Sequence, residues 1–379
     1  MPHGAHPDRP LLTRWLRQDV GLLVGAGGTS LVGALLVWSA THQAAGTAYL
    51  ARHLLNTAVG MALAVGVTRL GHHGLRLVAP WIYGVSLLGL LAVLTPLGLT
   101  VNGSRSWIPV AAGFTVQPSE FAKVGLVLVL AFVLAERWER RVAPTGRDVA
   151  LAWVLAAVPV ALIMLQPDLG SAVVLGALAF VVIAVAGAPR RWVAGVALAA
   201  AALVVAALTT PLLSEYQRDR LVAFADPSAD PEGIGYQTRQ VRLAIGSGGW
   251  GGQGFMEGRQ TQGGFIPYQL NDFIFSVAGE ELGFVGAAGL LVLLSFLVIR
   301  VFVVAGRSDD AFGRFVGIGV GTWLVFQVFQ NVGMNLGLLP VTGLPLPFVS
   351  YGGSSMFASW LAIGVVNAAY AAGQRHRPA

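Results

Sequence analysis

Ionisable side chains are rare along this sequence, and several stand where a long apolar run begins or ends. Glu120 and Lys123 open one such run, Asp168 follows the end of another, and Asp272 precedes a third. A carboxylate at the edge of an apolar helix can act as a general base, because partial burial raises its pKa toward the working range. Asp272 fits this role, and it fits a simple helix N-cap equally well.

Glu120 and Lys123 stand three residues apart, so their side chains can meet on one face of a helix. Lys123 is the only lysine in a chain with 23 arginines, which indicates that an ammonium group is needed at this position. Two interpretations remain open. The pair either stabilises the structure as an ion pair, or it shapes a site and contacts a substrate.

Further polar residues occur at corresponding places. Asn331 and Asn335 lie late in one apolar run, and Ser350 precedes the last run. Ionisable groups inside a membrane span cost a few kcal/mol each, so they tend to face a cavity or a partner. Together with Glu120 and Asp168, they predict a site at one end of a helix bundle.

These runs predict the elements that must position the site. The chain has 379 residues, of which 55% are hydrophobic and 11% charged, with a mean hydropathy of +0.70. Apolar blocks of about 20 residues are typical of membrane spans. We therefore predict an all-α, polytopic membrane bundle, with 1–379 as one integral membrane domain. Ten transmembrane helices are expected at 20–40, 50–68, 77–97, 118–135, 149–166, 169–188, 192–213, 273–303, 312–338 and 351–373.

Arginine placement predicts the orientation. With the N-terminus inside, 16 of the 23 arginines fall in cytoplasmic segments, whereas the short outer connections hold only Arg52 and Arg105. Basic residues concentrate on the cytoplasmic side of membrane proteins. Both termini are therefore expected in the cytoplasm, and 214–271, between the seventh and eighth helices, becomes a long extracytoplasmic loop. This placement explains the net charge of +6 without a nucleic acid partner.

Two absences narrow the possibilities. The chain has no cysteine, so it can hold neither a disulfide nor a cysteine-ligated metal. The first ten residues lack the apolar region of a signal peptide, and we expect no cleaved leader.

The long loop offers candidate ligands for an anion. Glycines at 246–249 allow close approach of the backbone to a ligand, although their spacing matches no phosphate-binding loop. Arg239, Arg242 and Arg259 could bind a pyrophosphate, and each fits a solvated loop face equally well.

Several runs together resemble the SEDS family (shape, elongation, division and sporulation proteins), in particular its RodA and FtsW branches. The similar runs are QPSEFAK at 117–123, QPDLGS at 166–171, IGSGG at 245–249, DFIF at 272–275 with GEELG at 279–283, NVGMNLGLLPVTG at 331–343 and PFVSYGG at 347–353. The resemblance extends from about residue 20 to 370.

The resemblance implies a peptidoglycan glycosyltransferase in a bacterial cytoplasmic membrane. Such an enzyme polymerises lipid II onto a growing lipid-linked strand of β-1,4 glycan and works with a class B penicillin-binding protein. The essential acid of the family matches Asp272, its Glu-Lys pair matches Glu120 and Lys123, and its Gln and basic residue match Gln240 and Arg242. The residues expected to bind substrate or shape the site are Glu120, Lys123, Arg105, Asp168, Gln240, Arg242, Arg259, Asn331 and Ser350.

One departure from the family pattern affects the mechanism. Tyr268 and Leu270 stand where relatives carry a Glu and a His ahead of the acid, so neither has a proton-transfer or metal role here. A second acid, if needed, must come from Glu120 or Asp168. A divalent cation, Mg²⁺ or Mn²⁺, is the one cofactor that this chemistry could use.

Other functions fit parts of the pattern. A flippase for lipid II would favour polar groups at the middle of the membrane, whereas these cluster at the outer end. A ligase of lipid-linked glycans has a similar architecture but different motifs. A non-catalytic scaffold for the penicillin-binding protein is compatible with polymerisation. The short N-terminal arm and the total length favour a RodA-type protein of cell elongation over an FtsW-type protein of division.

Overall fold

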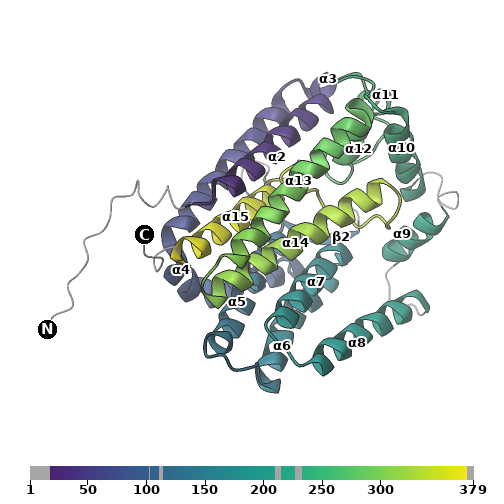
Figure 1. Cartoon of the computed structure of the whole chain (residues 1–379). Coiled ribbons are helices and arrows are strands. Elements are labelled where there is room, and N and C mark those ends of the chain that lie inside the picture. The colour runs from purple at the N-terminus through teal and green to yellow at the C-terminus, as the bar shows by residue number, and fades with distance from the viewer. Residues whose placement is uncertain (1–17, 102, 111–113, 210–214, 227–232, 374–379) are drawn as a thin grey trace.

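The computed structural model describes residues 18–101, 103–110, 114–209, 215–226 and 233–373. Helices dominate this part of the chain (Figure 1). They are α2 (Val20–Ser39), α3 (His42–Ala45), α4 (Ala48–Leu94), α5 (Pro118–Glu139), α6 (Gly146–Met164), α7 (Leu169–Val185), α8 (Arg190–Thr209), α9 (Glu215–Ala225), α10 (Ile234–Ser247), α11 (Arg259–Gln262), α12 (Ile274–Glu281), α13 (Gly283–Gly306), α14 (Ala311–Asn335) and α15 (Gly353–Gly373).

The predicted membrane bundle is confirmed. Among the described residues, six helices are long and apolar enough to cross a membrane, namely α2, α4, α5, α6, α13 and α14, and α7 is a shorter apolar helix. The exact number of ten spans stays a prediction. The long segment between α8 and α12 is not a plain loop, because it forms the short helices α9, α10 and α11.

The second and third predicted helices are joined into α4, without a connecting loop. The 47-residue helix changes direction at Gly71, which has φ 64° and ψ −179°. Glycine adopts positive φ without the steric penalty that a Cβ would bring. The separation that hydropathy predicted is therefore present as a kink in the backbone.

The eighth predicted helix is broken in two. α12 ends at Glu281 and α13 begins at Gly283, where φ is +64°. The glycine-rich segment packs against this break: Phe284 N donates to Gly249 O at 2.8 Å, and Gln253 N donates to Glu280 O at 2.9 Å. The segment thus satisfies backbone groups that a helix end leaves without partners.

Side chains would prevent this close packing. A Cβ at Gly252 would lie 2.1 Å from Glu281 O, and one at Gly248 would lie 2.0 Å from Gly279 O. The glycines that sequence analysis considered as a ligand-binding feature therefore allow contact with another part of the same chain.

α5 and α15 form the centre of the bundle. α15 packs against α2, α4, α5, α13 and α14, and α5 packs against α4, α6, α7, α14 and α15. Most of the first fourteen residues of α5, up to Ala131, are buried, including Glu120 and Lys123. α8 lies beside α7 at the edge of the bundle, as Figure 1 shows.

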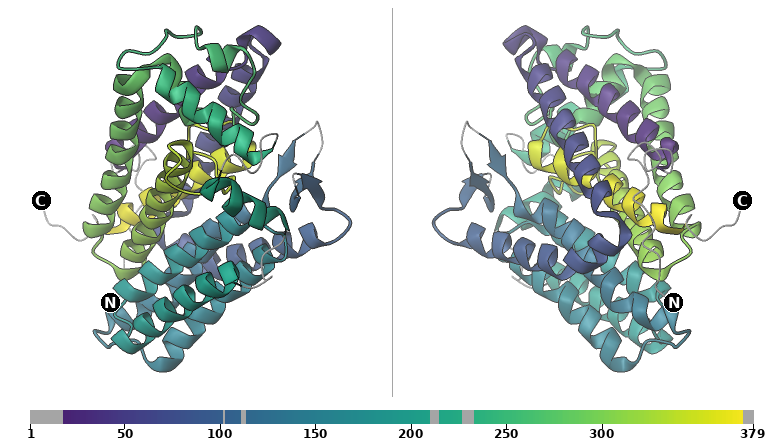
Figure 2. Two further views of the ribbon diagram at one scale, coloured as in Figure 1. Left: turned by 90° about the vertical axis from the view of Figure 1, so that its right-hand side faces the viewer. Right: turned by 90° about the vertical axis from the view of Figure 1, so that its left-hand side faces the viewer.

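A small antiparallel sheet connects α4 to α5. It consists of β1 (Leu99–Val101), β2 (Ser104–Pro109) and β3 (Thr115–Val116), in the order β1-β2-β3. The sheet projects from the side of the bundle (Figure 2). Ser104 Oγ donates to Gln166 O at 2.8 Å, which attaches the sheet to the end of α6. The sheet and the N-termini of α5, α7 and α15 therefore gather at one end of the bundle.

Candidate functional site

A cavity of about 250 Å³ opens at this end of the bundle. Asp272 lies in its wall. The lining residues come from four places in the sequence: Arg52 and Asn56 from α4; Trp107, Phe114, Thr115 and Gln117 from the sheet and its exit; Asn271, Asp272, Gly343 and Pro345 from the segments before α12 and after α14; and Tyr351, Gly352, Gly353, Ser354 and Ser355 at the start of α15.

The backbone of Asp272 is held by α14. Asn331 Nδ2 and Asn335 Nδ2 both donate to the carbonyl oxygen of Asp272, at 2.9 and 3.0 Å. Asn331 also donates to Leu344 O at 2.8 Å. Both asparagines are fully buried. They therefore position the acid through its main chain and leave its carboxylate to face the cavity.

The start of α15 fixes the residue before the acid. Ser350 Oγ donates to Asn271 O and accepts from Leu346 N at 2.7 Å. Asn271 Nδ2 donates to Tyr351 O at 2.9 Å. Ser350, predicted as a site residue, thus shapes the turn that carries Asp272 without lining the cavity itself.

The surroundings of Asp272 disfavour its charged form. Burial raises the pKa of the Asp272 carboxyl to about 6; the guanidinium of Arg220 opposes this rise, and the nearby Asp168 carboxylate adds to it. Arg220 and Asp272 flank Gly343, where a Cβ would lie 3.5 Å from Arg220 Nη2 and 3.6 Å from Asp272 Oδ2. A carboxyl with this pKa is mostly ionised at neutral pH and basic enough to accept a proton.

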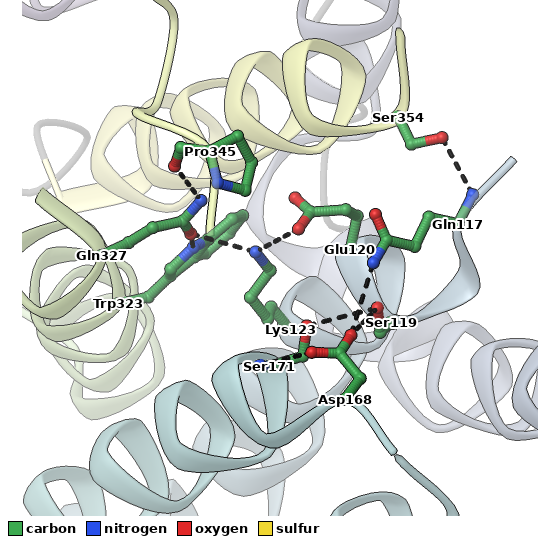
Figure 3. Close-up of polar contacts among 10 residues, drawn as sticks. All are labelled: Gln117, Ser119, Glu120, Lys123, Asp168, Ser171, Trp323, Gln327, Pro345 and Ser354. Atoms are coloured by element: carbon green, nitrogen blue, oxygen red, sulfur yellow. Dashed lines mark hydrogen bonds and ion pairs between the residues drawn. The ribbon is translucent and has the colours of Figure 1, made fainter. Parts of the chain in front are cut away.

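Glu120 and Lys123 form an ion pair inside the bundle, with 2.8 Å between Lys123 Nζ and Glu120 Oε1 (Figure 3). The two side chains are 1% and 0% exposed. Lys123 also donates to Gln327 Oε1 at 3.0 Å and lies over the ring of Trp323. The ammonium therefore has its partners within the protein.

This network reaches the cavity through one backbone group. Gln327 Nε2 donates to Pro345 O at 2.7 Å, and Pro345 lines the cavity. Of the two interpretations of the Glu120–Lys123 pair, the geometry favours a structural ion pair that supports the cavity wall over direct contact with substrate.

Asp168 is the N-cap of α7. Its Oδ1 accepts from Ser171 N at 3.0 Å, and its Oδ2 accepts from Gln117 Nε2 and Ser119 Oγ at 3.4 and 3.5 Å. Figure 3 shows these side chains converging on the carboxylate from α5 and α7. Asp168 lies outside the cavity wall and acts on Asp272 through its charge.

Four predicted site residues lie away from this cavity. Arg105 donates to Gly98 O and Thr95 O at 3.2 and 2.7 Å, at the C-terminal end of α4. Arg242 donates to Gly337 O at 3.3 Å, and Arg259 is an exposed residue at the start of α11. Gln240 lies on α10 and does not line the cavity. Their roles toward substrate stay predictions.

Sequence analysis missed other residues that line the cavity, notably Arg52, Asn56 and Trp107. For Arg52 a signal existed. It is one of two arginines in the short outer connections, where the bias toward basic residues inside makes arginine unusual. Asn56 and Trp107 carried no such signal, because their membership of the site depends on packing between distant segments.

The described residues contain no group of three or more His, Asp and Glu side chains that could hold a metal ion. The divalent cation expected from the sequence stays a prediction.

The chain is similar in sequence to known proteins over most of its length. The sequence model of one protein family, FtsW/RodA/SpoVE, described as cell cycle protein, matches residues 17–374. The chain is 36% identical over 334 residues to the peptidoglycan glycosyltransferase MrdB of Escherichia coli K12, covering 88% of each chain. It is also 36% identical over 364 residues to the probable peptidoglycan glycosyltransferase FtsW of Geobacter metallireducens, covering 92% of this chain and 94% of the relative.

Solved structures are similar over almost the whole chain. One is a chain from a peptidoglycan synthase complex that coordinates polymerization and crosslinking, with a TM-score of 0.79, 36% identity, and coverage of 96% of this chain and 100% of that one. Another is the rod shape determining protein RodA of Thermus thermophilus, with a TM-score of 0.71, 34% identity, and coverage of 96% and 99%.

Proposed function

The chain belongs to the FtsW/RodA/SpoVE family, and on that premise we propose that it polymerises lipid II into β-1,4 glycan strands at the outer face of a bacterial cytoplasmic membrane. It is a multi-pass membrane protein and a peptidoglycan glycosyltransferase of the SEDS family. The observation that carries the proposal is Asp272, an acid with a raised pKa in a cavity at one end of the bundle.

Asp272 acts as the general base in this proposal. Its carboxylate takes the proton of the sugar 4-hydroxyl of the incoming lipid II. The hydroxyl oxygen then forms a bond to the anomeric carbon of the growing strand, while the bond from that carbon to the pyrophosphate oxygen breaks. The sugar is α-linked to pyrophosphate and becomes β-linked in the polymer, so one displacement with inversion suffices. The proton passes from Asp272 to solvent, and the lipid pyrophosphate leaves.

Asn331 and Asn335 keep the base in place. Each donates to the Asp272 carbonyl from a buried position on α14, so the carboxylate is positioned by two hydrogen bonds that do not use its own oxygen atoms. A catalytic group held in this way needs little reorganisation during the reaction.

The partner and the branch of the family belong to the same proposal. A similar solved chain comes from a peptidoglycan synthase complex, which supports a class B penicillin-binding protein as partner. Relatives of both branches share 36% identity with the chain. The similarity to the rod shape determining protein RodA of Thermus thermophilus supports a RodA-type role in elongation and cell shape, and the arginine placement supports termini in the cytoplasm.

The function can be tested with purified protein and lipid II. We expect glycan polymer on a gel for the wild type, assayed with and without a class B penicillin-binding protein. Asp272→Ala and Asp272→Asn should reduce the rate about 10²–10⁴-fold, the usual effect of losing a general base. Asp309→Asn, which changes an exposed acid between α13 and α14, serves as the matched control.

Two results would contradict the proposal. Normal polymerisation by Asp272→Ala would remove the base from the mechanism. If the folded wild type made no polymer under either condition, the glycosyltransferase assignment would give way to a flippase or a scaffold, and transport of lipid II in vesicles would separate those two.

A further inference from the structure

The cavity has a second polar wall, formed by Arg52 and Asn56 of α4 and by residues 352–355 at the start of α15. Met356 N donates to Gly352 O at 3.1 Å, so Gly352 is the N-cap and Gly353 the first residue of the helix. The N–H groups of a first helical turn have no acceptor within the helix. Gly353, Ser354 and Ser355 carry these groups, and all three residues line the cavity.

Asn56 supplies independent evidence for a ligand at this wall. Its side chain is 4% exposed, and its Oδ1 atom has no hydrogen-bond partner in the described part of the chain. The amide lies beside the helix start, because a Cβ at Gly353 would be 3.7 Å from both of its polar atoms. Buried polar groups are almost always hydrogen-bonded. An unpartnered amide in a cavity wall therefore points to a bound molecule, and a 180° rotation of the amide presents Nδ2 to it as a donor.

The charge of this wall indicates an anion. Arg52 lines the cavity, and no acidic side chain among the described residues forms an ion pair with it. The N-terminus of α15 adds a partial positive charge, and exposed N–H groups at such a position bind phosphate well. A guanidinium, the N–H groups of a helix start and an amide thus face the same cavity as the Asp272 carboxylate.

The helix start is held rigidly enough to serve as a binding site. Gln117 N donates to Ser354 Oγ at 2.9 Å, and Ser354 Oγ donates to Thr115 O at 3.3 Å. These bonds join α15 to the strand β3 and to the beginning of α5. The three N–H groups therefore need no ordering when a ligand arrives.

We propose that Arg52, Asn56 and the first N–H groups of α15 bind the pyrophosphate of the lipid-linked donor, that is, the leaving group of the glycosyl transfer. This inference rests on the proposed function. When the bond between the anomeric carbon and the pyrophosphate oxygen breaks, the electron pair stays on that oxygen. The groups of this wall, called here the α15 anion subsite, stabilise the charge that develops there.

The size of the cavity favours the donor over the acceptor. The pyrophosphate of the donor is bonded directly to the reacting carbon, so it must lie within the same small cavity as the base. The pyrophosphate of the acceptor is two sugar rings away from its reacting hydroxyl. A cavity of about 250 Å³ has room for the reacting centre but not for a whole lipid-linked disaccharide. The arginines of the long loop, Arg242 and Arg259, do not line it.

Binding can be measured without turnover in the Asp272→Ala background. The probe is a sugar-free polyprenyl pyrophosphate, with the corresponding monophosphate for comparison. Adding Arg52→Gln should weaken binding of the pyrophosphate about ten- to hundredfold, the range for hydrogen bonds to charged groups, and should affect the monophosphate less. Adding Arg307→Gln instead, which changes an exposed arginine at the C-terminal end of α13, should leave binding unchanged.

A matched pair of variants tests the helix start. Gly353→Pro removes one N–H at the helical position where proline is best tolerated, and should weaken pyrophosphate binding. Gly353→Ala keeps the N–H and adds a Cβ at ordinary contact distance from Asn56, and should weaken binding less than Gly353→Pro does. Melting temperatures confirm that each variant is folded.

Several outcomes would overturn the subsite. The subsite would be excluded if folded Arg52→Gln bound the pyrophosphate as tightly as before, or if Arg307→Gln weakened its binding where Arg52→Gln did not. It would also be excluded if Gly353→Ala and Gly353→Pro weakened binding equally. In polymerisation assays of Arg52→Gln with the catalytic base intact, a lower kcat at unchanged KM for the acceptor lipid II supports a leaving-group role. An increase in that KM alone would place the pyrophosphate of the acceptor here and contradict the proposal.

Failure of the subsite leaves the proposed function standing, because polymerisation by the wild type and its loss in Asp272→Ala do not depend on Arg52. Conversely, normal polymer formation by Asp272→Ala would remove the proposed function whatever the binding results.

Discussion

The carboxyl of Asp272 must be ionised to accept a proton, and its pKa is raised to about 6, mainly by burial. The rate of polymerisation should therefore fall at low pH. Above pH 6 the base is mostly ionised, and activity is lost as the pH falls through about 6 and the carboxyl becomes protonated. We expect the rate of lipid II polymerisation to show an acid limb near pH 6. A rate that stays constant from pH 7 to pH 5 would exclude Asp272 as the base.

The charge on Asp168 offers a second test of the raised pKa of Asp272. Its carboxylate contributes to the raised pKa of Asp272. Asp168→Asn removes this charge and can still accept the hydrogen bond from Ser171 N that caps α7. The acid limb of the pH profile should move to lower pH, with little change in melting temperature. A limb that moves upward would contradict the electrostatic argument.

The ion pair of Glu120 and Lys123 is buried on all sides, so losing one partner leaves an unpaired charge. Lys123→Met should lower the free energy of unfolding by about 3–5 kcal/mol, seen as a lower melting temperature in detergent. The double variant with Glu120→Gln should recover much of this loss. If Lys123→Met kept full stability but lost polymerisation, the lysine would act on substrate instead.

At the scale of elements, the glycine-rich segment stabilises the break between α12 and α13. Gly252 has φ +84°, and a Cβ there would collide with Glu281 O. Gly252→Ala should therefore destabilise the protein by more than about 1 kcal/mol. Gly251→Ala is the matched control, because a Cβ at Gly251 would meet nothing within 4 Å, and it should stay within about 0.5 kcal/mol. Equal melting temperatures would show that the close packing contributes little.

Two acids of α12 also hold the short helix α11, which follows the glycine-rich segment. Glu280 accepts from Gln260 N and Thr261 N at 2.7 and 2.9 Å, and Glu281 accepts from Gln262 Nε2 at 2.9 Å. These bonds place α11 against the helix that directly follows Asp272. The segment is thereby part of the frame that holds the acid.

At the scale of the whole molecule, the predicted orientation can be measured directly, because the chain has no cysteine. Gly251→Cys lies in the long segment and Asp309→Cys lies between α13 and α14, both at exposed positions. In intact cells, a membrane-impermeant maleimide should label the first variant only. Both should react after lysis. Labelling of Asp309→Cys in intact cells would reverse the topology.

Hydropathy was sufficient to predict most helices, because burial in a membrane demands long apolar runs whatever their neighbours. α2, α5 and α7 lie close to their predicted ranges. The breaks were harder to predict. The break near Gly71 was predicted, but as a connecting loop and not as a kink within one helix. The gap before Gly283 depends on a single backbone angle, which leaves no mark on average hydropathy.

Some features of the site could likewise be predicted from the sequence, and others could not. Asp272 was predicted from its place at the start of an apolar run and from a family resemblance, and it lies in the cavity wall. Lys123 was singled out correctly as unusual, but its depth in the bundle and its partner Gln327 depend on how α5 and α14 pack. A sequence records the type of each side chain but not the direction in which it points.

What the sequence alone determined is the class of molecule, its apolar helices and the acid most able to do chemistry, since these depend on local composition and spacing. What only the tertiary structure decided is which residues share a cavity. Arg52 and Asn56 lie on α4, Asp272 lies before α12, and Gly353 lies at the start of α15, three segments that are far apart in the sequence. Their meeting depends on the rotation and packing of α4, α14 and α15, which are long-range properties that no local pattern specifies.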